Sequence, residues 1–235
     1  MCTKKYQKGS FMPRVNDEYI EKKRNEIIDA AYRVCVRKPI TSVEMKDVIA
    51  ETGFSHGAIY RYYKDLDEVL HDLVKKINSE NRIDDRLKMI LDHAGTKEWK
   101  RAIHEICDLL ADQMESVGTD LLKLSIYSDM LAMSDPKRAV NIAEKLGNDE
   151  QSPLLYLFST MTEYLSSVVE ERSLKPSKTI DEILQFITAS YHGIQTGYVL
   201  SDCFKAEQVQ GRYKPKEMFS CLAESVIVML DGRDY

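Results

Sequence analysis

The stretch from Thr41 to Leu70 constrains the fold of this chain more than any other segment. Apolar residues recur at helical spacing before Gly53, and a second short helical segment follows Ser55, a residue that suits the N-cap position. Gly53 favours the positive φ that ends a helix, and Thr41 with Glu44 fits a capping box at the start of the first helix. Two short helices joined by a glycine-containing turn predict a helix-turn-helix motif.

The second helix of this motif has one apolar and one polar face. Ile59 and Tyr63 lie four residues apart and predict the inward face. Ser55, His56, Tyr60 and Arg61, which are all able to bond a phosphate or a base edge, fall on the other face. Many short helix pairs in globular proteins only pack together, so the motif alone leaves a DNA-binding and a purely structural interpretation open.

The string Gly-Phe-Ser-His-Gly-Ala-Ile-Tyr-Arg-Tyr-Tyr-Lys at residues 53–64 is more specific. It resembles the DNA-binding domain of the TetR/AcrR family of transcriptional regulators. The apolar stripe of that family's first helix recurs here at Ile27, Ala30, Ala31 and Val34. The chain departs from the usual pattern of the family at Pro39, Glu44 and Leu66.

The resemblance implies an all-α protein with two parts. Residues 1–64 are expected to form a three-helix, helix-turn-helix DNA-binding domain, called the head below. Residues 65–235 are expected to form a helical bundle for ligand binding and dimerisation, called the body. Its implied partners are double-stranded operator DNA, a second copy of the chain and a small-molecule inducer, with no cofactor or metal.

The expected DNA contacts lie on the head. Arg61 and His56 are the predicted base readers, because arginine bonds guanine O6 and N7. Tyr60, Tyr62 and Lys64 match positions that contact phosphate in the family. The complete set of predicted DNA-binding residues is Arg24, Lys46, Ser55, His56, Gly57, Ala58, Tyr60, Arg61, Tyr62 and Lys64.

The distribution of charge agrees with this division. Residues 1–64 hold 13 Lys and Arg against 8 Asp and Glu, and the remaining residues hold 20 against 30, which together give the net charge of −5. A basic head on an acidic body is typical of a DNA-binding module joined to a part that does not bind DNA. A chance surface asymmetry explains the charge equally well when it is taken alone.

The rest of the chain indicates helices throughout. Helices are predicted over about 17–37, from Asp65 towards Leu91, and over about 97–116, 119–134, 154–171 and 179–203, with a last helix ending near Leu230. A loop is expected at 146–152 and breaks at Pro136 and at 211–215. The five cysteines are dispersed, and neither a secretory signal nor an apolar run of membrane-spanning length is apparent, so we expect a cytoplasmic protein with reduced thiols.

The last two helices carry wide apolar stripes. Burial of both stripes within one chain is the simpler interpretation of the periodicity. The layout of the family implies instead that these helices pair across a twofold axis. The predicted dimer contacts are Ile183, Ile187, Ile194, Phe219, Leu222 and Val226.

A ligand cavity in the body is expected to have an apolar wall. Ten methionines favour an adaptable cavity, although methionines and aromatics at helical spacing are more often ordinary core. The acidic balance of the body is compatible with a cationic ligand and also with a solvated surface. The candidate wall residues are Trp99, Cys107, Met114, Tyr127, Met130, Met161, Tyr164, Tyr191 and Gln195.

Catalysis finds little support in the sequence. His104, Cys107 and Asp108 share a helix face but do not make a complete metal-ligand set, and nucleotide-binding and hydrolase motifs are absent. We therefore expect a regulator that is not an enzyme, most simply a repressor that leaves a palindromic operator when a ligand binds. A helical adaptor that binds protein through its helix-turn-helix is the alternative.

Overall fold

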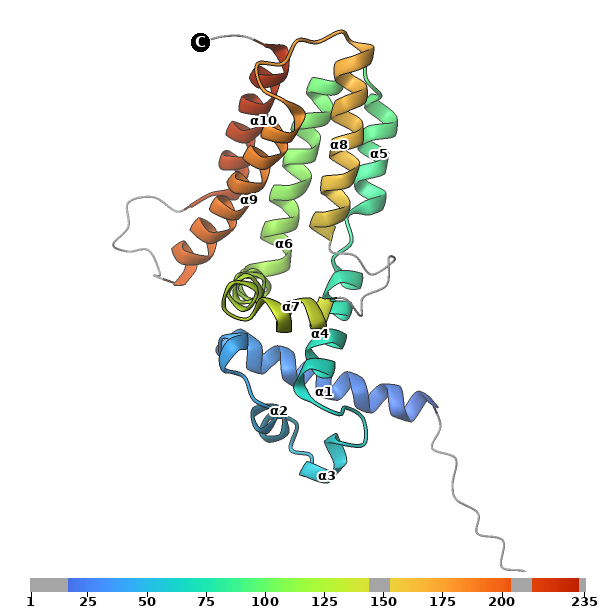
Figure 1. Cartoon of the computed structure of the whole chain (residues 1–235), viewed down its shortest axis with the longest axis vertical. Helices are drawn as coiled ribbons and strands as arrows, with labels where there is room; N and C mark the ends of the chain where they lie inside the picture. The colour runs from blue at the N-terminus through green and yellow to red at the C-terminus, as the bar shows by residue number, and fades with distance from the viewer. Residues whose placement is uncertain (1–16, 144–152, 204–212, 233–235) are drawn as a thin grey trace, which may run out of the picture.

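The computed structural model describes residues 17–143, 153–203 and 213–232. These residues form α-helices and one short 3-10 helix, with no strand in these ranges, so the all-α prediction is confirmed. Figure 1 shows the head at one end of an elongated molecule, a bundle at the other, and two helices between them. The helices are α1 (Asp17–Arg37), η1 (Ile40–Ser42), α2 (Met45–Thr52), α3 (His56–Ile59), α4 (Leu66–Glu80), α5 (Asp84–Ala94), α6 (Trp99–Ser134), α7 (Pro136–Ala143), α8 (Pro153–Glu171), α9 (Ile180–Cys203) and α10 (Pro215–Asp231).

The head has its own small core. Ile27 and Ala31 of α1 pack with Val48 of α2, and Ile59 and Tyr63 close the cluster from the second half of the motif. The same cluster continues into α4 and α6, so the first turns of α4 belong physically to the head's core. The domain boundary predicted at residue 64 stays a prediction, with α4 packed against both sides of it.

Helix α4 is shorter than the sequence pattern predicts. It ends at Glu80, and α5 starts anew at Asp84, so the expected continuation towards Leu91 is wrong. The reason is Asn81, whose side-chain amide donates to the carbonyl of Ile77 at 2.8 Å and caps the helix. An asparagine that bonds a helix carbonyl in this way competes with helix propagation.

Helix α6 joins the two parts of the molecule. It consists of two helical segments, as predicted over 97–116 and 119–134, and they meet at Gly118, where the backbone leaves helical geometry with φ 76° and ψ 162°. Figure 1 shows the segment after this kink turning away from the bundle axis towards the head. Leu124 and Leu131 of that segment pack in the head's core, whereas Ile106 and Leu110 before the kink pack in the bundle.

Helix α7 occupies a place where the sequence predicts only a break. Pro136 is its first residue, where proline's missing N–H costs nothing, and the Asp135 carboxylate accepts from the Arg138 backbone N–H at 3.1 Å. The residues that follow, including the predicted loop at 146–152, lie outside the described ranges, as does most of the break predicted at 211–215.

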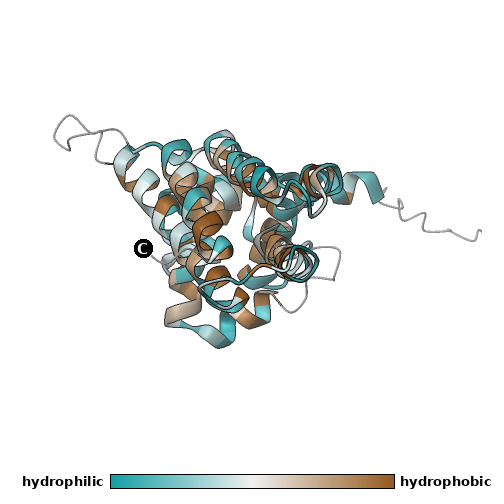
Figure 2. Cartoon of the chain, turned by 90° about the horizontal axis from the view of Figure 1, so that it is seen from above, coloured by the Kyte–Doolittle hydropathy of each residue, from teal (hydrophilic) through white to brown (hydrophobic). Residues whose placement is uncertain are grey.

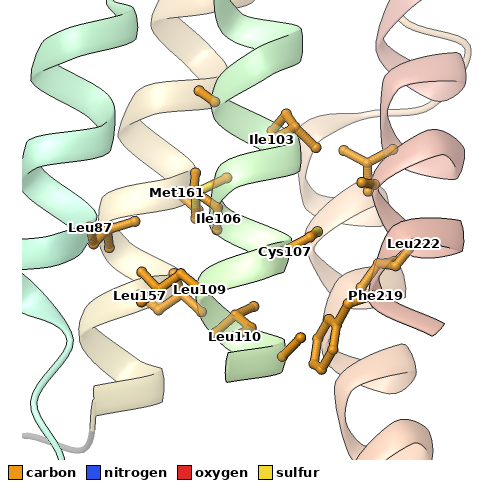
Figure 3. Close-up of a cluster of buried hydrophobic side chains, with 14 of the residues drawn as sticks. Leu87, Ile103, Ile106, Cys107, Leu109, Leu110, Leu157, Met161, Phe219 and Leu222 are labelled. Carbon is orange, nitrogen blue, oxygen red and sulfur yellow. The ribbon is translucent and has the colours of Figure 1, made fainter. Parts of the chain in front are cut away.

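The bundle encloses the larger core. Figure 3 shows Ile106, Leu110, Leu157, Met161 and Phe219 converging from three helices into one cluster of buried side chains. Seen from above in Figure 2, hydrophobic residues gather where helices face one another and hydrophilic residues cover much of the outside. Among the described residues, no helix is both long and apolar enough to cross a membrane.

Candidate nucleic-acid interface and body cavity

The turn of the helix-turn-helix is built by Gly53 and its neighbours. Gly53 has φ 68° and ψ 9°, as predicted, and its N–H donates to the carbonyl of Ile49 at 3.2 Å. The Phe54 N–H donates to the Thr52 hydroxyl at 3.1 Å, which fixes the chain as it leaves α2. The next segment therefore starts in a defined direction, from Ser55 at the N-cap position.

The predicted capping box at the start of α2 is displaced by one turn. The N-cap is Glu44, whose backbone N–H donates to the Asp47 carboxylate at 2.8 Å. Thr41 lies instead inside η1, which is held in place by the buried Ile40 and by Val43 just after it. The prediction of Thr41 as the cap is wrong because these buried side chains set the path of the backbone.

Helix α3 is a single turn, shorter than the motif suggests, but its two faces lie as expected. Ile59 is fully buried and Tyr63 nearly so, whereas the candidate contact residues Ser55, His56, Gly57, Tyr60 and Arg61 are exposed. The rings of His56 and Tyr60 are in contact, with centroids 4.7 Å apart and their planes tilted by 33°. Ala58 and Tyr62 are half-buried beside this surface, and Lys64 is exposed at its end.

Arg24 has a different environment from the other predicted DNA-binding residues. Its guanidinium forms an ion pair with Asp72 of α4 at 2.7 Å and lies over the Tyr63 ring, 4.5 Å from its centroid. The Tyr63 hydroxyl donates to the same Asp72 oxygen at 2.9 Å, and burial raises the pKa of Tyr63. The hydrogen bond to Asp72 raises the pKa of Arg24. Arg24 thus connects α1 to α4 and orients the end of the motif.

The lysines of the candidate surface stand beside acids. The ammonium of Lys46 lies 2.8 Å from Glu44, and the pKa of Lys46 is raised by that hydrogen bond. Lys64 lies 4.0 Å from Asp65 and remains highly exposed. Exposed ion pairs of this kind are weak, so both lysines keep the freedom to reach a phosphate.

A cavity of about 640 Å³ lies between the head and the bundle. Its volume is in the range that encloses a drug-sized molecule, roughly 300–1,000 Å³. Its walls come from α4, from α6 on both sides of the Gly118 kink, and from α7, α8 and α9. Most of the wall is apolar, with Leu73, Val74 and Ile77 of α4 facing Met114 of α6.

The cavity gathers three of the predicted wall residues: Met114, Tyr191 and Gln195. The other six lie elsewhere. Trp99, Cys107, Met161 and Tyr164 are buried in the bundle core, Tyr127 is partly buried against the head's core, and Met130 is largely exposed. The Tyr164 hydroxyl donates to the Gly95 carbonyl at 2.9 Å, a structural bond within the bundle.

Sequence reasoning missed the polar part of the cavity wall. Ser125, Ser128 and Asp129 of α6 line it together with His192 of α9. Polar residues on the otherwise apolar segment after Gly118 were the available signal. The contributions of α4 and α7 had no signal in the sequence, because they depend on how these helices meet.

The buried thiols show no sign of reactivity. Burial raises the pKa of Cys107 to about 12 and that of Cys35 to about 11, which keeps both protonated at neutral pH. Within the ranges that the structure describes, no three His, Cys, Asp or Glu side chains lie close enough together to hold a metal ion.

The predicted dimer contacts lie in the chain's own core. Five of them, Ile183, Ile194, Phe219, Leu222 and Val226, are buried within the protomer, and Ile187 is partly buried against the same cluster. The outward surfaces of α9 and α10 carry other apolar residues. Phe186 and Leu200 are 42% and 48% exposed, and Met218 of α10 is also exposed.

Comparison with known proteins gives two matches in sequence. A model of the tetR family of bacterial regulatory proteins matches residues 27–73. The Uncharacterized HTH-type transcriptional regulator YfiR of Bacillus subtilis (strain 168) is 29% identical over 109 residues, which are 46% of this chain and 51% of that protein. The matched part thus spans about half the length of that relative.

Two solved structures share the fold over most of the chain. The fatty acid degradation regulator FadR from Bacillus halodurans has a TM-score of 0.63 at 17% identity, covering 90% of this chain and 97% of that one. FadR from Bacillus subtilis in complex with stearoyl-CoA has a TM-score of 0.58 at 17% identity, covering 89% of this chain and 99% of that one. At these identities the likeness concerns the fold.

Proposed function

We propose that this chain is a member of the TetR family of bacterial regulatory proteins, a cytoplasmic repressor that binds a palindromic operator as a dimer and leaves it when a small ligand binds. The family and the fold are those of transcriptional regulators rather than enzymes. One observation carries the proposal: the family match covers the helix-turn-helix, and its candidate contact residues form an exposed surface beside a fixed turn.

This surface has the chemistry that DNA recognition needs. Arg61 and His56 supply donors for base edges, and Tyr60 and Lys64 supply groups for phosphate oxygens. Apart from its chain neighbours and the backbone of its own helix, nothing lies within 4 Å of the place a Cβ of Gly57 would take, so the backbone of α3 is open on this side. Arg24 acts as a positioning residue in this scheme, because Asp72 engages its guanidinium.

A second copy of the chain is the proposed occupant of the outward face of α9 and α10. Phe186, Leu200 and Met218 are exposed there, and the small residues Ala189 and Gly193 between them allow close helix approach. Figure 1 shows α9 and α10 side by side along one side of the bundle. A twofold axis through this face presents two heads, and recognition of half-sites one turn of DNA apart requires a spacing of about 34 Å.

The cavity connects ligand binding to the head through α7. Ala139, Ile142 and Ala143 of α7 line the cavity. The same helix holds α4, because Arg138 pairs with Asp67 at 2.7 Å and the Ile142 carbonyl lies 3.0 Å from His71 Nδ1. A ligand that displaces α7 or α4 therefore changes how the head is held, which is the proposed route of release.

The proposed function is tested on the full-length protein with DNA fragments selected from a random pool. Arg61→Ala is expected to weaken binding of the selected sequence by about 1–3 kcal/mol and to relax the preference at one base pair. Arg172→Ala, which removes an exposed arginine of the body, is the matched control and is expected to bind as the native chain does. Affinity is expected to fall steeply with salt, because binding releases counterions.

Two outcomes would remove the proposal. Binding that is insensitive to salt and to Arg61→Ala, or a partner protein retained by the same surface, would favour an adaptor.

The dimer is tested by sedimentation: Phe186→Asp is expected to yield monomers, whereas Met89→Asp, at a residue of α5 that is 70% exposed, is expected to leave the dimer intact. An unchanged dimer in Phe186→Asp would place the interface elsewhere.

A further inference from the structure

The cavity has one carboxylate in its wall and no strong base to balance it. Among the described residues that line it, Asp129 is the single acid, and neither lysine nor arginine is present. The nearest basic group in the wall is the His192 ring, whose Nδ1 lies 3.8 Å from an Asp129 oxygen. This separation is longer than a hydrogen bond, so the carboxylate retains unused acceptor capacity.

Asp129 is also partly removed from bulk water. Burial raises the pKa of its carboxyl, and the nearby His192 acts in the opposite direction. The side chain still keeps 53% of its surface accessible while lining the cavity, so a molecule in the cavity can reach it. Partial desolvation without a hydrogen-bond donor is unfavourable for a carboxylate, and a donor or a cation on a ligand relieves it.

The polar part of the wall has two stretches: Asn78 and Asn81 at the end of α4, and a strip where α6 meets α9. Ser125 lies one helical turn before Asp129 on α6, and Gln195 lies nearly one turn after His192 on α9. The Gln195 amide donates to the Leu122 carbonyl at 3.3 Å, which fixes that end of the strip. The wall contributed by α4 is apolar over Leu73, Val74 and Ile77, and its two asparagines are uncharged, so the one carboxylate among the described wall residues lies on the α6–α9 side.

We infer that the cavity binds a hydrophobic organic cation, such as an aliphatic amine. Its charged end pairs with Asp129, and its apolar part lies against α4 and the part of α6 that precedes Gly118. This inference rests on the proposed function only in taking the cavity as the ligand site. An anionic amphiphile is disfavoured, because its head would face a carboxylate with no lysine or arginine in the described wall. Stearoyl-CoA, which occupies one of the similar structures, carries several phosphates and is therefore an unsuitable ligand here.

The inference is tested by calorimetric titration of the full-length protein, without DNA, with dodecylamine and with dodecanoate below their micelle concentrations. Dodecylamine is expected to bind on the order of tenfold more tightly than dodecanoate, because a charge-assisted hydrogen bond to a partly buried group is worth about one such factor. Asp129→Asn is expected to abolish this difference by weakening dodecylamine and not dodecanoate. Asp120→Asn is the matched control, because Asp120 lies on the same segment of α6 but outside the cavity wall.

A second comparison changes the ligand and leaves the protein untouched. N-Dodecylacetamide keeps the alkyl chain of dodecylamine and removes its charge, so it is expected to bind the native protein about tenfold more weakly. This measurement keeps the inference falsifiable if Asp129→Asn fails to fold. Equal affinities of the amine, the amide and dodecanoate, or a loss of amine binding that is the same in both aspartate variants, would overturn it.

The outcome is separable from that of the proposed function. Retained sequence-selective DNA binding with no preference for the amine would leave the regulator standing and remove only the ligand class. Amine binding that depends on Asp129, in a protein that does not bind DNA, would support the ligand class and remove the proposed regulator.

Discussion

The head and the body are stabilised by different means. The head has a small apolar core that is braced by polar links between helices: Arg24 to Asp72, Lys38 to Asp47 at 2.6 Å, and Lys76 to Asp29 at 2.6 Å. The body has polar links too, such as Lys100 to Asp231 at 2.6 Å, but it buries a wider cluster of aliphatic and aromatic side chains than the head does. Between the head and the body, neither polar links nor packed apolar side chains fill the space, and the cavity lies there.

This difference suggests how the proposed DNA surface is held in one arrangement while a ligand changes the packing between the head and the body. Polar braces fix the direction of α1 and α4 with few side chains, whereas close-packed aliphatic groups give the bundle most of its free energy of folding. The helices between them, α4 and α7, add Leu70, Leu73 and Ile142 to the head's core and also line the cavity. Four predictions follow from this contrast, in order of decreasing effect.

The largest loss of stability is expected in the bundle core. Phe219 is almost fully buried, and Phe219→Ala is expected to lower the free energy of unfolding by about 3–5 kcal/mol, since it removes apolar contact and leaves a void. Urea unfolding at fixed protein concentration measures this, with the adjacent exposed Ser220→Ala as control. A loss below about 1 kcal/mol would mean that the site collapses around the smaller side chain.

In the head, loss of the hydrogen bond between Tyr63 and Asp72 is expected to lower the free energy of unfolding by less than Phe219→Ala does. Tyr63→Phe removes the hydroxyl that donates to Asp72 and is expected to cost about 1.5 kcal/mol, the lower end for a bond to a charged group, because Asp72 is partly exposed. Tyr62→Phe is the matched control. If both substitutions lower the free energy of unfolding by the same amount, the hydrogen bond from Tyr63 to Asp72 adds nothing to the stability of the head.

At the junction, the pair between Arg138 and Asp67 is expected to contribute about 0.5–1 kcal/mol, since both side chains are partly exposed. A double-mutant cycle with Arg138→Ala and Asp67→Ala isolates this coupling. If the pair transmits the ligand signal, either variant also weakens the effect of ligand on DNA binding. Additive losses in the cycle would exclude a direct coupling between α7 and α4 through this pair.

The sequence predicted helix bounds in both parts, those of α8 and α9 to within one residue, but it did not predict how the helices of the body meet. In the head, α1 has the predicted bounds and buries its stripe at Ile27 and Val34, and Gly53 ends α2 in a conformation that other residues rarely adopt. Most of the wall of the expected cavity could not be predicted, because it forms only when α4, α7 and the kinked α6 meet. Periodicity identified the apolar stripe of α10 but not what covers it, and Phe219 proved to face its own chain.

The smallest effect concerns pH and the brace around Glu51. Hydrogen bonds from Arg33 and Arg37 lower the pKa of the Glu51 carboxyl. The pKa of Glu51 is therefore lower in the folded than in the unfolded chain. Its bonds to the two arginines stabilise the head above about pH 4.5, and this stabilisation is lost as the pH falls through the folded pKa.

Glu51→Gln is therefore expected to lower the urea midpoint slightly at neutral pH and to match the native chain in strong acid. The effect is also expected to shrink in high salt, because all three side chains are near water. Glu163→Gln, at an exposed position of the body, serves as the control. A deficit in Glu51→Gln that persists below about pH 3 would assign the loss to packing instead of charge, and the contrast between a polar-braced head and an apolar body would weaken.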